Sequence, residues 1–361
     1  MNLFQTQQAE NKRYYFYRKR KNDFEAVELD EINVLALNKL ADIFKKRNSL
    51  RIPRILLDNW DYVALFNSNG NIEKANSLYF IKDCSVYDLN NSLNDLSSKE
   101  WLSETVTVFT QKGLGKSNAH AQIEKQHPAP FSFQDVGRLI RFFTKEGDCV
   151  LDPFVGVAST LKACAVEHRI GYGFELNDKY YQLGNQRLEL EISPDEIYRN
   201  KQNLLHGDCR DLLKKCTDQM FDFLITSPPY WNILDTVDHK VKQTRIADKL
   251  DSKYSTSEKD YGNIETYEDF INELSYFFDS CSRVLKSRKY MVVIVSDFRK
   301  KDKFYLFHSD LSKEIEALGN FSLKGVRILH QKFKSIYPYG YPFSFVPNIH
   351  HQYVLILQKN K

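Results

Sequence analysis

The chain lacks the features that mark several large classes of protein. Its 361 residues contain no run of about 18 apolar side chains, which argues against a membrane-spanning helix. The first residues show no basic segment followed by an apolar one, so we expect no secretory signal. None of the six cysteines belongs to a Cys-x-x-Cys pair, and reduced thiols without a metal framework fit best. These absences predict a cytoplasmic protein with no metal site and no membrane partner.

Charge is low overall but unevenly distributed. The formal net charge is +4, yet residues 280–335 hold 13 Lys or Arg against five Asp or Glu. Near the start, residues 12–21 place six cations around four aromatic rings. Because cations neutralise phosphates and aromatic rings stack on unpaired bases, both segments are candidates for contact with nucleic acid. A nonspecific basic arm or a solvated edge strand explains the N-terminal run equally well.

Residues 222–232 combine an apolar strand with an unusual ending. The run Phe223–Ile225 predicts a buried strand, and Pro228 and Pro229 prevent its continuation. A residue before proline is restricted to extended conformations, and proline itself has no N–H donor. Residues 227–230, which we call the lip, therefore form a stiff backbone rich in hydrogen-bond acceptors. Such a lip suits a planar ring with an exocyclic amine, although a proline turn after a strand is the simpler interpretation of these residues alone.

Three strand ends upstream of the lip carry residues suited to ligand binding. Residues 149–152 predict a strand ending at Asp152, followed by a loop that contains Gly156 and then a helix. The next two predicted strands end in the acids Glu175 and Asp208. In open α/β sheets, ligands bind at the carboxyl ends of strands, and an acid at the second strand end binds ribose hydroxyls. The four strand ends together predict one cofactor pocket beside the lip.

These motifs and their order resemble the S-adenosylmethionine-dependent DNA amino-methyltransferases, and most of all the N4-cytosine members. The resemblance covers residues 105–361 and implies S-adenosylmethionine as cofactor and double-stranded DNA as partner. It also implies a restriction–modification system, with a cognate restriction endonuclease as a candidate partner and a monomer or homodimer as the assembly. The matching motifs are HPAPF at 127–131, DPFVGVAST at 152–160, FEL at 174–176, GD at 207–208 and TSPPY at 226–230.

The resemblance assigns a role to each matched cofactor residue. The loop after Asp152 would cradle the methionine part of the cofactor, and Phe131 would close that side of the pocket. Glu175 would hold the ribose hydroxyls, and Asp208 would accept a hydrogen bond from the adenine amine. Ala158 stands where a second glycine is usual, which puts a close approach of the loop to the cofactor in doubt. The expected cofactor-binding residues are Phe131, Asp152, Phe154, Gly156, Glu175 and Asp208.

The lip supplies the expected catalytic residues. The Ser227 hydroxyl and the Pro228 carbonyl would accept hydrogen bonds from the two amine hydrogens and aim the nitrogen lone pair at the methyl group. Tyr230 or Trp231 would stack on the base after its extrusion from the duplex. The catalytic candidates are Ser227, Pro228, Pro229 and Tyr230.

Ser227 also carries the prediction of the target base. Within the family, Ser-Pro-Pro resembles enzymes that act on cytosine N4, whereas adenine N6 enzymes more often have Asp or Asn at the first position. An adenine-N6 enzyme, an RNA base methyltransferase and a noncatalytic DNA-binding subunit remain alternatives. Enzymes that methylate cytosine at carbon 5 use a nucleophilic cysteine that follows a proline. No cysteine of this chain follows a proline, so this reaction is excluded. A dehydrogenase is disfavoured because the first loop has the single glycine Gly156 in place of three spaced glycines.

The predicted fold is α/β, with a seven-stranded doubly wound class I methyltransferase sheet and a small N-terminal α+β domain. The α+β domain covers residues 1–100, with a helix at 33–47 and strands at 62–66 and 77–82; target recognition and dimerisation are its candidate functions. The catalytic domain covers 101–361, and its polar segment 233–266 would become ordered over DNA or be disordered. Catalytic-domain helices are expected at 132–145, 159–168, 178–191, 267–286 and 308–318, and strands at 149–153, 169–175, 203–207, 221–226, 290–297, 322–330 and 351–358, with the last two antiparallel.

One aromatic stretch near the end of the chain has two interpretations. Residues 337–343 hold four aromatic rings, two prolines and a glycine. The family places a loop before its last strand that packs against the flipped base, and this stretch is a candidate for that loop. A packed turn between strands is the alternative that we favour.

Overall fold

The computed structural model divides the chain into two compact units, which are described separately. One unit comprises Met1–Thr105 with Arg141–Glu146, and the other comprises Val106–Ile140 with Gly147–Lys361. No helix among the described residues is long and apolar enough to span a membrane. The described residues are 13–20, 23–28, 62–67, 77–82, 85–88, 91–112, 123–124, 132–231, 259–300, 302–332 and 334–361.

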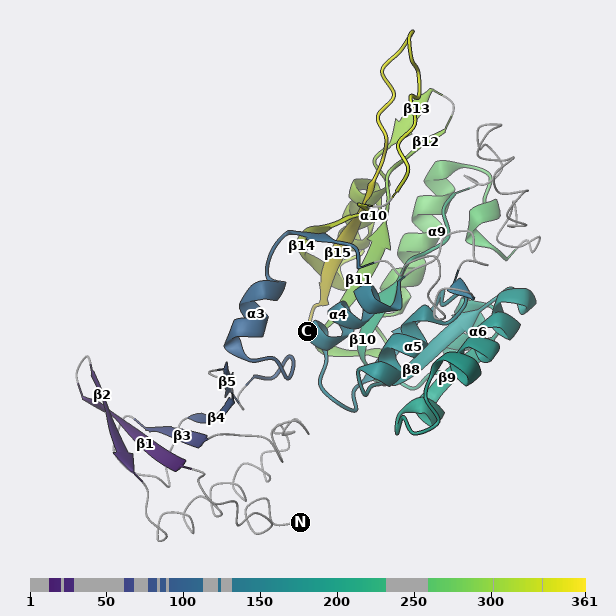
Figure 1. Ribbon diagram of the computed structural model, residues 1–361. Helices are drawn as coiled ribbons and strands as arrows, with labels where there is room; N and C mark the ends of the chain where they lie inside the picture. Colours follow the sequence, from purple (N-terminus) through teal and green to yellow (C-terminus); the bar gives the residue numbers. More distant parts are fainter. Residues whose placement is uncertain are drawn as a thin grey trace. The chain divides into compact units, whose positions relative to one another are not determined.

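The smaller unit contains a five-stranded sheet in the order β2-β1-β3-β4-β5 (Figure 1). The basic and aromatic run forms β1, which lies inside this sheet, antiparallel to β2 and parallel to β3. The interpretation of this run as a free arm or an edge strand is therefore wrong. The predicted strands at 62–66 and 77–82 are present, whereas the helix expected at 33–47 lies outside the described residues. The strands are β1 (Arg13–Arg20), β2 (Asp23–Glu28), β3 (Tyr62–Asn67), β4 (Ser77–Lys82) and β5 (Ser85–Asp88).

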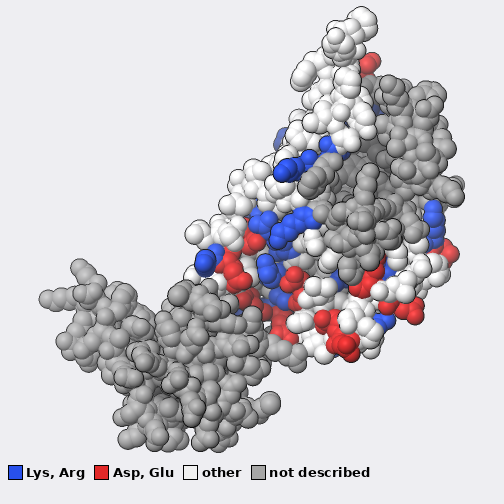
Figure 2. All heavy atoms as spheres, viewed as in Figure 1, with Lys and Arg blue, Asp and Glu red and all other residues white. Residues whose placement is uncertain are grey.

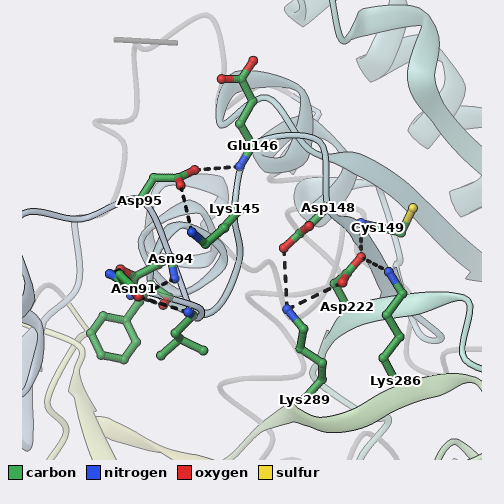
Figure 3. Close-up of polar contacts among 12 residues, drawn as sticks. Asn91, Asn94, Asp95, Lys145, Glu146, Asp148, Cys149, Asp222, Lys286 and Lys289 are labelled. Atoms are coloured by element: carbon green, nitrogen blue, oxygen red, sulfur yellow. Dashed lines mark hydrogen bonds and ion pairs between the residues drawn. The ribbon is translucent and has the colours of Figure 1, made fainter. Parts of the chain in front are cut away.

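Polar contacts join residues 91–95 to residues 142–146 within this unit (Figure 3). The Asn94 side chain donates to the Phe142 carbonyl oxygen at 2.6 Å, and the Glu146 N–H donates to an Asp95 carboxylate oxygen at 2.8 Å. Helix α3 (Ser98–Glu104) follows, opened by a capping box in which Ser97 and Glu100 bond each other's backbone N–H groups. These contacts explain why residues 141–146, at the end of a helix that begins in the larger unit, belong to the smaller unit.

A mixed sheet of eight strands forms the centre of the larger unit, in the order β6-β14-β15-β11-β10-β7-β8-β9 (Figure 1). Strands β11, β10, β7, β8 and β9 run parallel, whereas β15 is antiparallel to both of its neighbours. The doubly wound sheet and the antiparallel final pair are as predicted. The strands are β6 (Val108–Thr110), β7 (Cys149–Asp152), β8 (Ile170–Glu175), β9 (Gln202–His206), β10 (Phe221–Thr226), β11 (Leu285–Val295), β14 (Phe321–His330) and β15 (His351–Lys359).

Helices cover the sheet from both sides, which explains the continuous apolar runs of its central strands. Met291, Val293 and Val295 belong to one core with α7, α9 and α10, while the intervening Val292 and Ile294 are buried on the other face. Helices α5 and α6 pack on β8 and β9. The helices are α4 (Phe133–Phe143), α5 (Ser159–Val166), α6 (Asp178–Glu191), α7 (Cys209–Lys215), α9 (Tyr267–Ser280) and α10 (Phe307–Ala317), with 3-10 turns at Arg199–Lys201 and Tyr261–Asn263.

One buried acid fastens the amino ends of the central strands. Asp222 in β10 accepts a hydrogen bond from the Cys149 N–H at 3.1 Å and pairs with Lys286 at 2.8 Å and Lys289 at 3.6 Å (Figure 3). Lys289 also approaches Asp148 at 3.8 Å. Because a buried charge must be paired, these lysines explain how an acid is tolerated in an otherwise apolar strand.

The structure corrects several details of the prediction. The sheet has eight strands because β6 adds to β14, and the hairpin β12 (Phe298–Lys300) and β13 (Lys303–Tyr305) was not foreseen, nor were α3 and α7. Residues 259–266 of the supposed DNA-ordered or disordered segment are folded, with Asp260 and Tyr261 buried. The rest of that segment lies outside the described residues.

The close contact between α6 and the loop after β7 generates a testable prediction. A methyl group added at Gly184 would lie 2.8 Å from Leu204 Cδ2 and 3.3 Å from Ala158 Cβ. Gly184→Ala should therefore lower the free energy of unfolding by about 1–3 kcal/mol, despite the better helix propensity of alanine.

Gly137→Ala is the matched control for this substitution. Gly137 lies in α4, and its added Cβ would meet mainly the side chain of Glu167, with Oε1 at 3.3 Å. This flexible chain end can yield, so the control should be neutral or stabilised by up to about 1 kcal/mol. Urea unfolding of both variants measures the difference, and equal shifts would contradict the packing account.

Candidate functional site

Asp152, at the carboxyl end of β7, joins the lip to the loop between β7 and α5, which we call the first loop. One carboxylate oxygen accepts from the Phe154 N–H at 3.0 Å and from the Thr226 hydroxyl at 2.6 Å. The other accepts from the Thr160 hydroxyl in α5 at 2.5 Å. Burial raises the pKa of Asp152 to about 6, although these three hydrogen bonds oppose the shift. Since Thr226 directly precedes Ser227, one buried carboxylate sets the position of both the cofactor loop and the lip.

The loop between β7 and α5 turns sharply around residues of positive φ. Gly156 has φ 55° and Ala158 has φ 62° with ψ 32°, the left-handed conformation that favours glycine. Alanine is therefore strained at the position where a glycine was expected. Its methyl group is fully buried and is accommodated by the missing side chain of Gly184.

A buried ionic network holds the outer side of the same loop. The Arg187 guanidinium, fully buried in α6, donates to the Ser159 hydroxyl at 2.7 Å and to the Val157 carbonyl oxygen at 3.3 Å. It also pairs with Glu124 at 2.8 Å and Glu191 at 3.0 Å. Because these bonds end on the loop backbone at Val157 and on Ser159, the first residue of α5, Arg187 fastens α6 to the loop and to the start of α5.

Glu175 ends β8 and lies beside the first loop. Its carboxylate accepts from the Asn177 N–H at 2.6 Å, and the Gly156 N–H also donates to it. Burial raises the pKa of Glu175 to about 7 against these bonds, and the nearby Asp152 and Asp260 raise it further. The position is the one expected for an acid that receives two hydroxyl groups.

Asp208 follows β9 and caps α7, where it accepts from the Arg210 N–H at 2.8 Å. The Arg210 guanidinium forms a two-pronged pair with the same carboxylate, with Nε–Oδ1 at 3.0 Å and Nη2–Oδ2 at 2.7 Å. Burial favours the neutral acid, but the bonds from Arg210 prevail and lower the pKa of Asp208. Arg210 also donates to the Lys259 carbonyl oxygen at 2.6 Å, so Asp208 and residue 259 are fastened to one guanidinium.

Residues 259–264 form a wall of the pocket that the sequence did not reveal. The ring of Tyr261 meets the ring of Phe154 edge to face, with centroids 5.8 Å apart, and the Arg210 guanidinium lies 4.9 Å from the centroid of the Tyr261 ring. Asp260 accepts from the Gly262 N–H at 2.9 Å and caps this turn. Only the acidic cap before a glycine at 260–262 hinted at local order in a polar stretch.

The lip leaves β10 at the same edge of the sheet. The Tyr230 hydroxyl forms hydrogen bonds with the Gln352 side chain, the Ser296 backbone and the Ser227 side chain, while burial raises its pKa to about 12. Its ring packs against Phe307 at 5.8 Å between centroids. The phenol is therefore neutral and oriented toward Ser227.

Trp231 does not lie open as a stacking surface. It is buried, donates from its indole N–H to the Ile264 carbonyl oxygen at 2.9 Å, and packs against Tyr267 and Tyr305. The alternative in which Trp231 stacks on the base is therefore wrong.

One pocket gathers nine of the ten expected site residues. Phe131 is the exception, because it lies outside the described residues. Four further lining residues were not assigned a role from the sequence: Thr160, Lys259, Asp260 and Tyr261. Of these, Thr160 lies within a recognised motif, as does Thr226, the residue before Ser227. The lining comprises Asp152, Pro153, Phe154, Val155, Gly156, Val157, Ser159, Thr160, Phe174, Glu175, Leu176, Asn177, Tyr180, Gly207, Asp208, Cys209, Ser227, Pro228, Pro229, Tyr230, Lys259, Asp260 and Tyr261.

The pocket suits a nucleoside-bearing cofactor. Glu175 offers acceptors for ribose hydroxyls, the turn at Gly156 leaves room beside the first loop, and aromatic and apolar groups complete the walls. Among the described residues no group of three or more His, Cys, Asp or Glu is arranged to hold a metal ion. A doubly wound sheet with such a pocket opening onto a Ser-Pro-Pro-Tyr lip defines a methyltransferase of the class that uses S-adenosylmethionine.

The chain belongs to the N6/N4 DNA methylase family, whose model matches residues 9–186 and 221–361. This confirms the resemblance to S-adenosylmethionine-dependent DNA amino-methyltransferases. Membership does not distinguish cytosine N4 from adenine N6, since the family includes both.

Curated relatives include type II methyltransferases. The chain is 31% identical over 102 residues to M.MthZI of Methanothermobacter thermautotrophicus, 34% over 109 residues to M.BglI of Bacillus subtilis, and 33% over 109 residues to M2.DpnII of Streptococcus pneumoniae. The matches cover 28–30% of this chain. They span 28%, 28% and 36% of the respective relatives.

The solved structures found to be similar to this chain include two methyltransferases. A putative DNA modification methylase from Thermus thermophilus, complexed with S-adenosyl-L-methionine, is 21% identical, with a TM-score of 0.29 over 43% of this chain and 52% of that one. A SAM-dependent methyltransferase from Methanosarcina mazei is 14% identical, with a TM-score of 0.39 over 62% of this chain and 97% of that one.

The raised pKa of Glu175 predicts pH-dependent cofactor binding. An ionised carboxylate accepts from two hydroxyl groups, whereas a protonated one loses part of that capacity. With a pKa near 7, Glu175 becomes ionised as pH rises from 6 to 8, so S-adenosylmethionine affinity should rise over this interval. Since the ionised fraction rises about tenfold between pH 6 and pH 8, the gain in affinity over this interval should be at most about tenfold.

Glu175→Gln is the matched control, because glutamine cannot ionise. Titration calorimetry of S-adenosylmethionine across this pH range should give a flatter profile for the variant than for the native chain. An equally steep profile in both proteins would show that another group, such as Asp152 with its pKa of about 6, controls binding.

Proposed function

We propose that this chain transfers a methyl group from S-adenosylmethionine to the exocyclic N4 amine of a cytosine flipped out of duplex DNA. The observation that carries the proposal is that one pocket is lined both by Glu175 and by Ser227. A cofactor held along the first loop would thus meet an acceptor held at the lip. We further propose that the enzyme serves a restriction–modification system, since the curated relatives include type II methyltransferases.

The cofactor residues divide the work along the pocket. Glu175 is proposed to hold the ribose hydroxyls, and the loop at Phe154 and Gly156 to flank the methionine part. The carboxylate of Asp152 already accepts three hydrogen bonds within the chain, so we assign it a positioning role in place of direct contact. Asp208 already pairs with Arg210, so a bond to the adenine amine would use a remaining lone pair on its oxygens.

The lip orients the acceptor amine. S-Adenosylmethionine, when bound, supplies a methyl group on a cationic sulfur and so requires no covalent enzyme intermediate. The Ser227 hydroxyl and the Pro228 carbonyl accept hydrogen bonds from the two amine hydrogens, which draws the nitrogen lone pair out of conjugation and toward the methyl group. The bond from sulfur to the methyl group breaks as the new bond to nitrogen forms, which leaves S-adenosylhomocysteine, and the nitrogen then loses one proton to water. Pro229 stiffens the lip, and Tyr230 orients Ser227 and faces the base.

The proposal of cytosine in place of adenine rests on the short side chain of Ser227. A serine hydroxyl is shorter than the carboxylate or amide usual in adenine enzymes, so the amine must come closer to the backbone of the lip. Adenine N6 and an RNA base are the competing acceptors, and a noncatalytic DNA-binding subunit is the competing role.

Product analysis tests this function. The purified protein is incubated with labelled S-adenosylmethionine and duplex DNA, and the DNA is then digested to nucleosides. The expected product is N4-methylcytosine; exclusive N6-methyladenine would refute the assignment from Ser227. Labelling of RNA alone would identify an RNA enzyme, and cofactor binding without transfer to any nucleic acid would indicate a noncatalytic subunit.

Ser227→Ala is the matched variant for the same assay. Loss of one hydrogen bond to the reacting amine should reduce single-turnover transfer by roughly ten- to a hundredfold. The affinity for S-adenosylmethionine should be unchanged, because Ser227 is proposed to contact the acceptor. Full activity in the variant would shift the catalytic role to the Pro228 carbonyl.

A further inference from the structure

The connection between β14 and β15 is a long projection (Figure 1). It leaves the sheet at the same end as the lip. Residues 331–350, which we call the finger, link these two antiparallel strands. Strand β15 is antiparallel to β11, which parallels β10, so the finger leaves the sheet where the lip does. The Ser296 hydroxyl donates to the His351 carbonyl oxygen at 3.3 Å, and Gln352 bonds the Tyr230 side chain. The start of β15, which directly follows the finger, is therefore in contact with Tyr230 of the lip.

The finger has a defined conformation. Backbone contacts close its root, where the Gln331 N–H donates to the His350 carbonyl oxygen at 2.8 Å. Halfway along, the Asn348 side chain accepts from the Tyr337 N–H at 2.9 Å and donates to the Tyr337 carbonyl oxygen at 2.8 Å. The tip turns on a bond of 2.7 Å from the Phe343 N–H to the Gly340 carbonyl oxygen.

The tip exposes large apolar side chains. Phe343 is 94% exposed, Phe345 88%, Tyr341 81% and Ile336 72%. The expectation that this stretch forms a packed turn is therefore wrong. Residues 335–349 contain no charged side chain, and the end of the projection is mostly white in Figure 2, with one red group beside it. An exposed apolar group of this kind marks a contact surface.

The charges around the finger favour a binding partner that is a polyanion and also has exposed apolar faces. No acidic residue occurs between 331 and 350, whereas Lys332 and Lys334 stand at the start of the finger. The hairpin that follows β11 at the same edge contributes Arg299, Lys300 and Lys303 against Asp302. Cations at the root and uncharged rings at the tip match the phosphates and the base faces of nucleic acid.

We propose that the finger enters duplex DNA beside the target base and fills the gap that the base leaves when it moves into the pocket. This inference rests on the proposed function. Extrusion of a base leaves two uncovered base faces in the duplex, and aromatic side chains stack on such faces. Apolar side chains also act as wedges between base steps. The finger is thus a second DNA contact, distinct from the lip that holds the extruded base.

Removal of the two most exposed rings tests the proposal. Phe343→Ala/Phe345→Ala should weaken binding to a short duplex carrying the methylated sequence by roughly tenfold or more, measured by fluorescence anisotropy with S-adenosylhomocysteine present. Single-turnover transfer to this duplex should also slow. Transfer should recover on a duplex with an abasic site opposite the target base, because less pairing then opposes extrusion. If the native chain methylates no DNA, the same anisotropy comparison is made on a duplex of arbitrary sequence.

Tyr276→Ala is the control, since Tyr276 is an exposed aromatic residue in α9 and should leave DNA affinity unchanged. Unchanged duplex affinity in the double variant would overturn the proposal. The proposal would also be overturned if the native protein were a dimer and the double variant a monomer with the same DNA affinity. The finger would then be a contact between two copies of the chain. Absence of transfer by the native chain on any DNA is a separate result that refutes the proposed function, because anisotropy reports the finger independently.

Discussion

The buried carboxylate of Asp152 is the constraint on which the site depends. It receives the backbone of the first loop, the first turn of α5 and the last residue of β10. Each of these donors belongs to a different element; the first loop and α5 line the pocket, and β10 leads directly into the lip, which also lines it. A carboxylate in a dry interior is costly unless its hydrogen bonds are satisfied, so the three donors are coupled to one another through their common acceptor. In this way the first loop and the lip, which are about 75 residues apart in sequence, are held in a fixed position relative to each other.

Other contacts extend the same rigidity outward. Arg187 fixes the loop from the side of α6, and Arg210 fastens Asp208 to the wall at residue 259. At the far end of the strands, Asp222 and its lysines secure β10 against β7 and β11. The parallel strands thus have a salt-bridged network at their amino ends and the pocket at their carboxyl ends, where ligands bind in open α/β folds.

The sequence revealed those parts of the molecule whose signals are local. Parallel strands buried on both faces appear as apolar runs, and their ends are marked by acids, glycine or proline, so the pocket was predicted from Asp152, Glu175, Asp208 and the lip. The three-residue strand β6 and the seven-residue helix α7 were missed because short elements have little periodicity. The wall at residues 259–264 was missed because its order comes from packing against Phe154 and Arg210, which no local pattern shows. The free exposure of the aromatic tip was also missed, since composition alone favours burial of aromatic rings.

The coupling through Asp152 is the central claim, and a double-mutant cycle with Thr226→Val and Asp152→Asn tests it most directly. Valine keeps the shape of threonine in β10 and removes only the hydroxyl donor. The rate of single-turnover methyl transfer should fall in each single variant, and the double variant should be little worse than Asp152→Asn alone, with a coupling energy of about 1–3 kcal/mol. Fully additive losses would contradict the account, because they would show that Thr226 and Asp152 act on the site independently.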